Sequence, residues 1–201
     1  MTIYLARHGI TNWNEERKYQ GWSDIRINAK GKKQAKALAR ALESNPPKFV
    51  YCSTLSRARE TAGVIVDRFD VPCREEESLK EMNFGDWEGQ TVEELAQKES
   101  LNWDKFRNQP QEIRPTGGES VKELKDRIQS FWKTLDEQTE RPIAVVTHGG
   151  PLRVFILSLL EAPLSSFWRL KIAPASLTVL EGGNSGYIVS KVNDTSHLED
   201  L

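Results

Sequence analysis

Cysteine is scarce in this sequence: Cys52 and Cys73 are the only two among 201 residues. Two cysteines are too few for the disulfide framework of a small extracellular protein. Neither has the spacing of a metal-ligand pair, so no metal site is expected. We therefore expect two buried, reduced thiols in a cytoplasmic protein.

Long apolar runs and charge of one sign are also lacking. No window approaches the roughly 20 residues of a transmembrane helix, and no signal-peptide pattern is evident. The formal net charge of −1 gives no overall attraction to nucleic acid or to an anionic membrane. We expect neither kind of partner, and any affinity for phosphate must come from a local cluster of side chains.

Short apolar runs alternate with helical patterns in a composition of 38% hydrophobic and 28% charged residues, typical of a globular protein. The predicted strands are 2–6, 49–52, 143–147, 177–180 and 187–189. The predicted helices are 29–43 with Asn28 as N-cap, 56–69, 120–135, and 151–160 with Pro151 in its first turn.

This alternation predicts an α/β fold, a three-layer α/β/α sandwich with a mostly parallel central sheet. The last two strands flank a glycine-rich turn at 182–186 and predict an antiparallel hairpin at one edge. The length fits a single domain over 1–201. Residues 83–118, rich in aromatics and proline, predict a small helical, cap-like insertion, a natural place for substrate selection.

Two of the three histidines follow predicted strands, and a glycine comes after each: Arg7-His8-Gly9 and Thr147-His148-Gly149. Ligands of open α/β sheets bind outside the carboxyl ends of the strands. Arginine beside histidine there indicates an anionic substrate, with the histidine as nucleophile or base. Arg57 opens the helix that follows the second strand and adds a further cation near this crevice.

Taken together and in this order, six segments resemble the histidine phosphatase superfamily, whose fold is that of phosphoglycerate mutase. They are Arg7-His8-Gly9-x-Thr11-x-x-Asn14, Gln20-Gly21-x-x-Asp24, Ser53-x-Leu55-x-Arg57-Ala58-x-x-Thr61, Leu79-x-Glu81-x-x-Phe84-Gly85-x-Trp87-Glu88-Gly89, Gly117-Gly118-Glu119-Ser120 and Thr147-His148-Gly149. They span nearly the whole chain. Taken alone, the acidic segment around Glu81 would be interpreted as a solvated loop.

The resemblance implies a role for each matching residue. His8 is the nucleophile that becomes a phosphohistidine, and Glu81 protonates the leaving group and then activates water. Arg7, Arg57 and His148 hold the phosphoryl group. Further phosphate-binding positions are Thr11, Asn14, Gln20, Gly21 and Gly149. The resemblance implies neither a metal nor another cofactor.

General physical chemistry agrees with these roles. Phosphoryl transfer spreads negative charge over three oxygens, which the forked donors of two arginines match. An attacking imidazole must be unprotonated. Because the alkoxide of a phosphomonoester leaves poorly, a protonated carboxyl in line with it contributes about 10²–10⁴-fold.

The interpretation we favour is a metal-independent phosphomonoesterase that acts on small phosphorylated metabolites. One alternative is a 2,3-bisphosphoglycerate-dependent phosphoglycerate mutase, but such mutases carry a larger insertion with paired arginines. Here Arg107 and Arg114 are well separated. A second alternative is a non-catalytic module that binds a phosphate ligand, against which the retained His8 and Glu81 argue.

The substrate itself cannot be read from the sequence beyond a small-molecule phosphate ester. Phe84 and Trp103 suggest an apolar wall that selects among esters. His197 lies either in a free tail or, as the resemblance suggests, near the pocket entrance. Homodimers are common in the family, and the oligomeric state stays open.

Overall fold

The most apolar of the strands predicted to be parallel, β4 (Ile143–Thr147), is buried along its whole length at the centre of a sheet. The sheet is a feature of the computed structural model of residues 1–201, in which all but residues 99, 136–141, 184–185 and 200 are described. β4 pairs in parallel with β1 (Thr2–Arg7) on one side and with β2 (Phe49–Ser53) on the other. All three were predicted as strands, and 143–147 was the one predicted to be central.

The sheet has six strands in the order β3-β2-β4-β1-β5-β6. β3 (Cys73–Glu76) extends the parallel part beside β2. β5 (Leu177–Gly183) runs antiparallel to β1, and β6 (Gly186–Asp194) runs antiparallel to β5 at the edge. The predicted mostly parallel sheet with an antiparallel edge is therefore confirmed.

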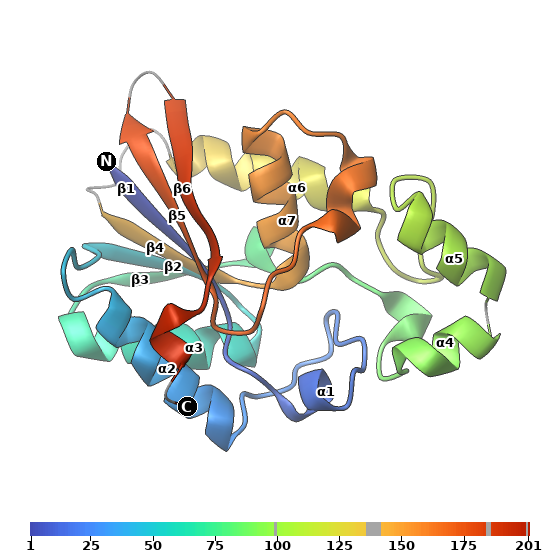
Figure 1. The fold of residues 1–201 in the computed structure, drawn as a ribbon, viewed down its shortest axis with the longest axis horizontal. Helices are drawn as coiled ribbons and strands as arrows, with labels where there is room; N and C mark the ends of the chain where they lie inside the picture. Colours follow the sequence, from blue (N-terminus) through green and yellow to red (C-terminus); the bar gives the residue numbers. More distant parts are fainter. Residues whose placement is uncertain (99, 136–141, 184–185, 200) are drawn as a thin grey trace.

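Helices cover both faces of the sheet, as Figure 1 shows. α2 (Ala29–Ala41) and α3 (Ser56–Phe69) lie on one face, and α6 (Val121–Leu135) and α7 (Gly149–Leu159) on the other. Alternate side chains of each strand point to opposite faces. In β4, Ala144 and Val146 join the core under α2 and α3, whereas Val145 joins the core under α6 and α7. This is the predicted three-layer α/β/α sandwich.

The helix ends follow local chemistry. Asn28 caps α2, since its side chain accepts a hydrogen bond from the amide of Gly31. α7 begins at Gly149, two residues earlier than predicted, so that Pro151 occupies its first turn, where its missing N–H costs no hydrogen bond. The early start places the first amides of α7 next to the end of β4.

The sequence did not predict β3, because its residues Cys-Arg-Glu-Glu are polar and mostly exposed. A charged edge strand of this kind discourages pairing with other chains. The expectation of two buried thiols is wrong for Cys73, which is exposed on β3, while Cys52 is buried on β2. The two sulfur atoms lie 3.7 Å apart as free thiols.

The 83–118 segment is helical, as predicted, and contains the 3-10 turn η2 (Gly85–Trp87) and the helices α4 (Val92–Lys98) and α5 (Ser100–Asn108). In Figure 1, α4 and α5 lie at the end of the molecule opposite α2 and α3. Aromatic rings packed edge to face hold the insertion together. Phe106 contacts Trp87 at 5.1 Å and Trp168, in η3 (Leu164–Arg169), at 5.4 Å between ring centroids.

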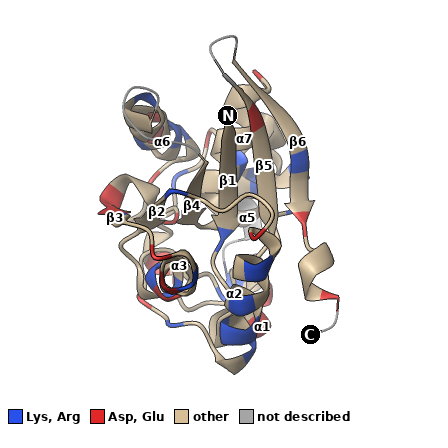
Figure 2. Ribbon diagram, turned by 90° about the vertical axis from the view of Figure 1, so that its left-hand side faces the viewer, with Lys and Arg blue, Asp and Glu red and all other residues tan. Residues whose placement is uncertain are grey.

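The remaining turns are short. They are α1 (Asn12–Glu15), η1 (Glu77–Leu79) and η4 (Ser196–Leu198). Basic and acidic residues are interspersed over α3 and α6, whereas α2 carries basic residues and no acidic ones (Figure 2). Within the described part of the chain, none of the helices combines the length and the apolar character needed to cross a bilayer.

Phe106 anchors the insertion, so its replacement tests how the insertion is held. The side chain is fully buried, and we expect Phe106→Ala to lower the free energy of unfolding by about 3–5 kcal/mol, as for other buried phenylalanines. Urea unfolding followed by tryptophan fluorescence measures this loss. Asn102→Ala, at an exposed position of the same helix, is the matched control. A loss below about 1 kcal/mol for Phe106→Ala would contradict this packing.

Candidate active site

The parallel pairing of β1 with β4 brings the two strand-end histidines together. Arg7 and Thr147 are register partners at the ends of β1 and β4, and a histidine directly follows each of them. The amide of His8 donates to the carbonyl of Thr147 at 3.0 Å, and the two imidazole centroids are 5.1 Å apart. Both rings are buried, with 1% of His8 and none of His148 exposed.

The hydrogen bond of His8 fixes which ring nitrogen carries the proton. Its Nδ1 lies 2.7 Å from the carbonyl oxygen of Gly9, which can only accept. Nδ1 therefore carries the hydrogen, and Nε2 of the neutral ring keeps its lone pair. Burial, and then the charges of Arg57 and Arg7, hold the pKa of His8 well below its ordinary value. At neutral pH this imidazole is therefore unprotonated.

Arg57, in the first turn of α3, has no exposed surface and binds three groups through its guanidinium. Nη2 donates to the carbonyl of Gly21 at 2.7 Å, Nη1 to that of Ser23 at 2.9 Å, and Nε to Nδ1 of His148 at 3.2 Å. The proton of the neutral His148 ring is therefore on Nε2, which donates to Ser53 Oγ at 2.8 Å. Burial, followed by the charge of Arg57, also lowers the pKa of His148 well below its ordinary value.

Arg7 is the second buried guanidinium beside His8. Its Nη1 donates to the carbonyl of Ile172 at 2.6 Å, whereas its buried Nε has no hydrogen-bond partner among the described residues. Burial lowers the pKa of Arg7 to about 10, although the charge of Glu81 opposes the shift. An unpaired buried donor is costly, and an anion in the site would offset that cost.

Glu81 lies against the N-terminus of α7. Its Oε2 accepts from the amide of Gly149 at 3.1 Å, and its Oε1 from the amides of Gly150 at 3.0 Å and Met82 at 2.8 Å. A Cβ atom at Gly150 would overlap Oε1, so only glycine fits there with the carboxyl group in this place. The first amides of α7 thus hold the Glu81 side chain in place.

Arg127, which the sequence did not single out, holds this segment in place. Arg127 donates to the carbonyls of Ser78, Lys80 and Glu81 at 2.6, 2.7 and 2.8 Å. The same guanidinium pairs with the carboxylate of Glu119, which lies in the Gly-Gly-Glu-Ser motif. Arg127 lies seven residues after Ser120, where the nearest motif segment ends, so no local pattern reveals its partners.

Glu88 holds the loop that carries Gln20 and Gly21. Its Oε1 accepts from the amide of Trp22 at 2.8 Å, and its Oε2 from the amide of Ser23 at 2.8 Å and the hydroxyl of Ser23 at 2.6 Å. Gly21 has φ +52°, and any side chain there would overlap the Glu88 carboxylate. Glu88 thus fixes the loop whose carbonyls bind Arg57.

These side chains surround a cavity of about 180 Å³. Of the predicted site residues, those that line it are Arg7, His8, Asn14, Gln20, Gly21, Arg57, Glu81, Phe84 and Gly149. Four further lining residues were not predicted: Lys18, Tyr19, Arg153 and Trp168. Thr11 and His148 lie behind the wall, where the hydroxyl of Thr11 donates to Oε1 of Gln20 at 3.0 Å. The amide of Gly149 faces Glu81, as described above.

Two predicted specificity residues lie elsewhere. Trp103 is 5% exposed and packs behind the wall, with its ring centroid 5.6 Å from that of Tyr19. His197 is not among the lining residues. It is half-buried in η4, and its Nε2 lies 2.9 Å from the carbonyl oxygen of Ala175, so this tail is folded against the domain.

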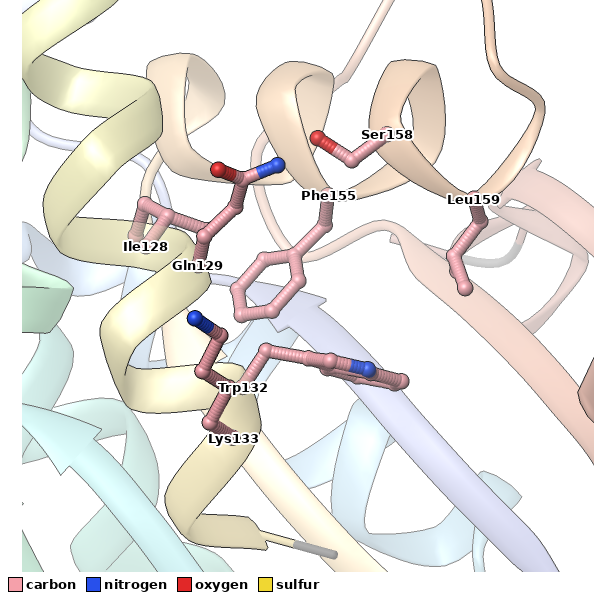
Figure 3. Close-up of a pocket in the computed structure, with 7 residues that line it drawn as sticks. All are labelled: Ile128, Gln129, Trp132, Lys133, Phe155, Ser158 and Leu159. Atoms are coloured by element: carbon pink, nitrogen blue, oxygen red, sulfur yellow. The ribbon is translucent and has the colours of Figure 1, made fainter. Parts of the chain in front are cut away.

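A second hollow, of about 380 Å³, lies between α6 and α7 and is lined by Ile128, Gln129, Trp132, Lys133, Phe155, Ser158 and Leu159 (Figure 3). Lys133 is the one titratable side chain among the described residues that line it. Among the described residues, no group of three or more His, Cys, Asp or Glu side chains is placed to hold a metal ion. The chemistry-bearing residues gather in the smaller cavity.

Comparison with known proteins places this site in a family. The model of the histidine phosphatase superfamily (branch 1) matches residues 3–195, so the chain belongs to that superfamily. It is 30% identical over 200 residues to phosphoserine phosphatase 1 of Hydrogenobacter thermophilus, covering 99% of this chain and 95% of that protein. It is 31% identical over 206 residues to a probable phosphoglycerate mutase, GpmB, of Salmonella paratyphi C, with the same coverage.

The solved structure of Bacillus stearothermophilus YhfR is similar over the whole fold. Its TM-score is 0.91 at 32% sequence identity, covering 98% of this chain and 99% of that one. The family resemblance that the sequence motifs predicted is therefore confirmed.

The buried histidines predict how stability depends on pH. Because the folded-state pKa values of His8 and His148 lie below 6.5, the unfolded chain takes up protons first as the pH falls. Stability from these two groups is fully present above pH 6.5 and decreases below it. Each contributes a slope of up to about 1.4 kcal/mol per pH unit.

Urea unfolding between pH 7.5 and 4.5 measures this slope. We expect His8→Asn to reduce the slope of stability against pH by the contribution of close to one bound proton. His197→Asn, at a half-buried position, should flatten it less. An unchanged slope in His8→Asn would show that His8 titrates alike in the folded and unfolded states.

Proposed function

We propose that this protein is a metal-independent phosphomonoesterase that hydrolyses small phosphorylated metabolites through a phosphohistidine on His8. The observation that carries the proposal is the environment of His8 Nε2. It belongs to a neutral, buried imidazole, flanked by two guanidinium groups and facing a cavity that Glu81 also lines. The similarity to a phosphoserine phosphatase supports a phosphate ester as the substrate.

In the first step, the phosphoryl oxygens accept hydrogen bonds from Arg7 and Arg57, which stabilise the charge of the transition state. Nε2 of His8 attacks phosphorus and the P–O ester bond breaks. The bonding pair goes to the alcohol oxygen, which takes the proton of the Glu81 carboxyl group. The hydrogen bond from Nδ1–H to Gly9 then stabilises the positive phosphoimidazolium ring.

In the second step, the Glu81 carboxylate takes a proton from water, and the water oxygen attacks phosphorus. The P–N bond breaks and its electron pair returns to Nε2 of His8. Inorganic phosphate leaves, and Glu81 is protonated again for the next cycle. One carboxyl group thus serves as acid and then as base, which requires that it stay within reach of the same phosphorus atom.

The mutase alternative is less favoured by the geometry. Arg114 forms an exposed ion pair with Glu123, and Arg107 stacks over Trp103 and Trp168 at 5.8 and 5.3 Å. Neither lines the cavity, so the insertion offers no pair of arginines for a second phosphate. A non-catalytic phosphate-binding module has no need of the neutral His8 and the adjacent Glu81.

Trapping the phosphoenzyme tests the proposed function. Mixing the protein with p-nitrophenyl phosphate and quenching it rapidly should yield about one protein-bound phosphate per chain, labile to acid and stable to alkali. His8→Ala should lack it, because the attacking nitrogen is gone, whereas His197→Ala should keep it. Continued release of inorganic phosphate in the presence of a chelator is also expected. Isomerisation of phosphoglycerates that depends on 2,3-bisphosphoglycerate, without phosphate release, would overturn the proposal.

The acid role of Glu81 predicts a dependence on the leaving group. Glu81→Gln should reduce kcat by about 10²–10⁴-fold for an alkyl phosphate, whose alkoxide needs a proton, and far less for p-nitrophenyl phosphate. Steady-state kinetics on the two esters measures the difference. Equal losses on both would remove Glu81 from this role.

Gly150→Ala tests the position of the Glu81 carboxyl group, since the new Cβ displaces this group without removing it. Like Glu81→Gln, it should reduce activity on an alkyl phosphate far more than activity on p-nitrophenyl phosphate. Gly63→Ala is the matched control, because its Cβ meets open space on α3, and both activities should be unchanged.

A further inference from the structure

Arg153 is a largely buried cation in the cavity that the proposed phosphoryl transfer does not use. It projects from α7 one turn after Gly149 and lines the same cavity as His8. Its Nε donates to the carbonyl of Leu170 at 3.0 Å, and no ion pair with a carboxylate is found for it within the described part of the chain. A buried cation without a counter-ion is costly, and such groups cluster at functional sites.

Aromatic rings hold the Arg153 guanidinium in a fixed place. Its central carbon lies 4.9 Å from the ring centroid of Trp168 and 5.4 Å from that of Phe167. Trp168 is itself fixed, because its Nε1 donates to the carbonyl of Phe106 at 3.0 Å. Nε of the guanidinium is therefore hydrogen-bonded to the backbone, and its faces pack against aromatic rings. The terminal nitrogens are left as the donors available to a ligand.

Arg153 lies beside the phosphoryl site. A Cβ atom placed on Gly149 would be 3.1 Å from Nη1 of Arg153 and 3.8 Å from Nε of Arg7, so the two guanidinium groups flank the same glycine. The two like charges repel each other. After burial, the charge of Arg7 is the main cause that lowers the pKa of Arg153, to about 10.

The charges of the cavity wall leave Arg153 unmatched. The lining cations are Arg7, Lys18, Arg57 and Arg153, and Glu81 is the lining carboxylate. Lys18 is paired with Glu16, with the atoms 2.7 Å apart. A phosphoryl dianion matches Arg7 and Arg57, which flank His8. The remaining positive charge belongs to Arg153, and a second negative group on the ligand would complement it.

We propose that Arg153 binds a carboxylate of the substrate, so that the substrate is a small phosphorylated carboxylic acid. The inference rests on the phosphomonoesterase function proposed above. The planar fork of a guanidinium matches a carboxylate through two parallel hydrogen bonds. A volume of about 180 Å³ is small beside the roughly 300–1,000 Å³ of sites for drug-sized ligands, which favours a short chain between phosphate and carboxylate.

Two esters that differ only in the carboxylate, O-phosphoserine and O-phosphoethanolamine, test the inference. The wild-type protein should hydrolyse phosphoserine with the higher kcat/KM. Arg153→Gln should lower kcat/KM for phosphoserine at least tenfold, mainly through KM, and change that for phosphoethanolamine less than twofold. Arg153→Lys should restore part of the loss. Arg114→Gln, an exposed cation of the insertion, should change neither, and thermal unfolding checks that each variant is folded.

Equal losses on both esters would mean that Arg153 holds the phosphoryl group, which overturns the inference and leaves the proposed function standing. Calorimetric binding to His8→Ala separates binding from turnover. Phosphoserine should bind at least tenfold more tightly than phosphoethanolamine, and the double variant with Arg153→Gln should lose that preference. Equal binding of the two esters would overturn the inference. Selective binding without phosphate release from any ester by the wild-type protein would instead refute the function and support the carboxylate site.

Discussion

The active site depends on the burial of Arg57. Its guanidinium joins three parts of the chain that are distant in sequence, since it binds the loop carbonyls of Gly21 and Ser23 and the ring of His148. Its charge also helps to keep His8 and His148 unprotonated. One buried cation thus supplies both the framework of the site and the electrostatics that a nucleophilic imidazole requires.

The loop from Gln20 to Asp24 shows how this arrangement is maintained. Arg57 binds its carbonyls from one side, and the Glu88 carboxylate binds its amides from the other. Asp24, at the end of the loop, accepts hydrogen bonds from the amide and hydroxyl of Ser56 at 2.7 Å each, at the start of the helix that carries Arg57. The loop is therefore held between two charged groups of opposite sign.

The features that the sequence predicted are those with a local signal. The apolar strands and amphipathic helices indicated a mostly parallel sheet with an antiparallel edge, and strand ends and motif segments identified His8, Arg57 and Glu81. β3 was not predicted, because an edge strand needs little apolar surface. Trp103 was assigned to a substrate wall because composition places aromatics in the insertion but does not say which face they occupy. In the structure Tyr19 lines the cavity, and Trp103 packs against Tyr19.

Arg153, Trp168 and Lys18 could not be predicted for a related reason. They come from three separate segments and meet only at the cavity. Arg153 lies on a helix whose other residues are mostly buried and apolar, so its pattern is that of a core helix with one charged position. Only the three-dimensional structure shows that this position faces Arg7 across Gly149.

The helix α7 links the two ends of the proposed substrate. Its first amides, at Gly149 and Gly150, hold the Glu81 carboxyl that we propose as the proton donor to the leaving oxygen, and Arg153 follows one turn later. With a rise of about 1.5 Å per residue, Arg153 starts roughly 6 Å further along the helix axis than Gly149. Because one rigid helix sets this interval, the distance from the scissile oxygen to a carboxylate on Arg153 is fixed by the fold. Chain length, and not only charge, then becomes a basis for selecting the substrate.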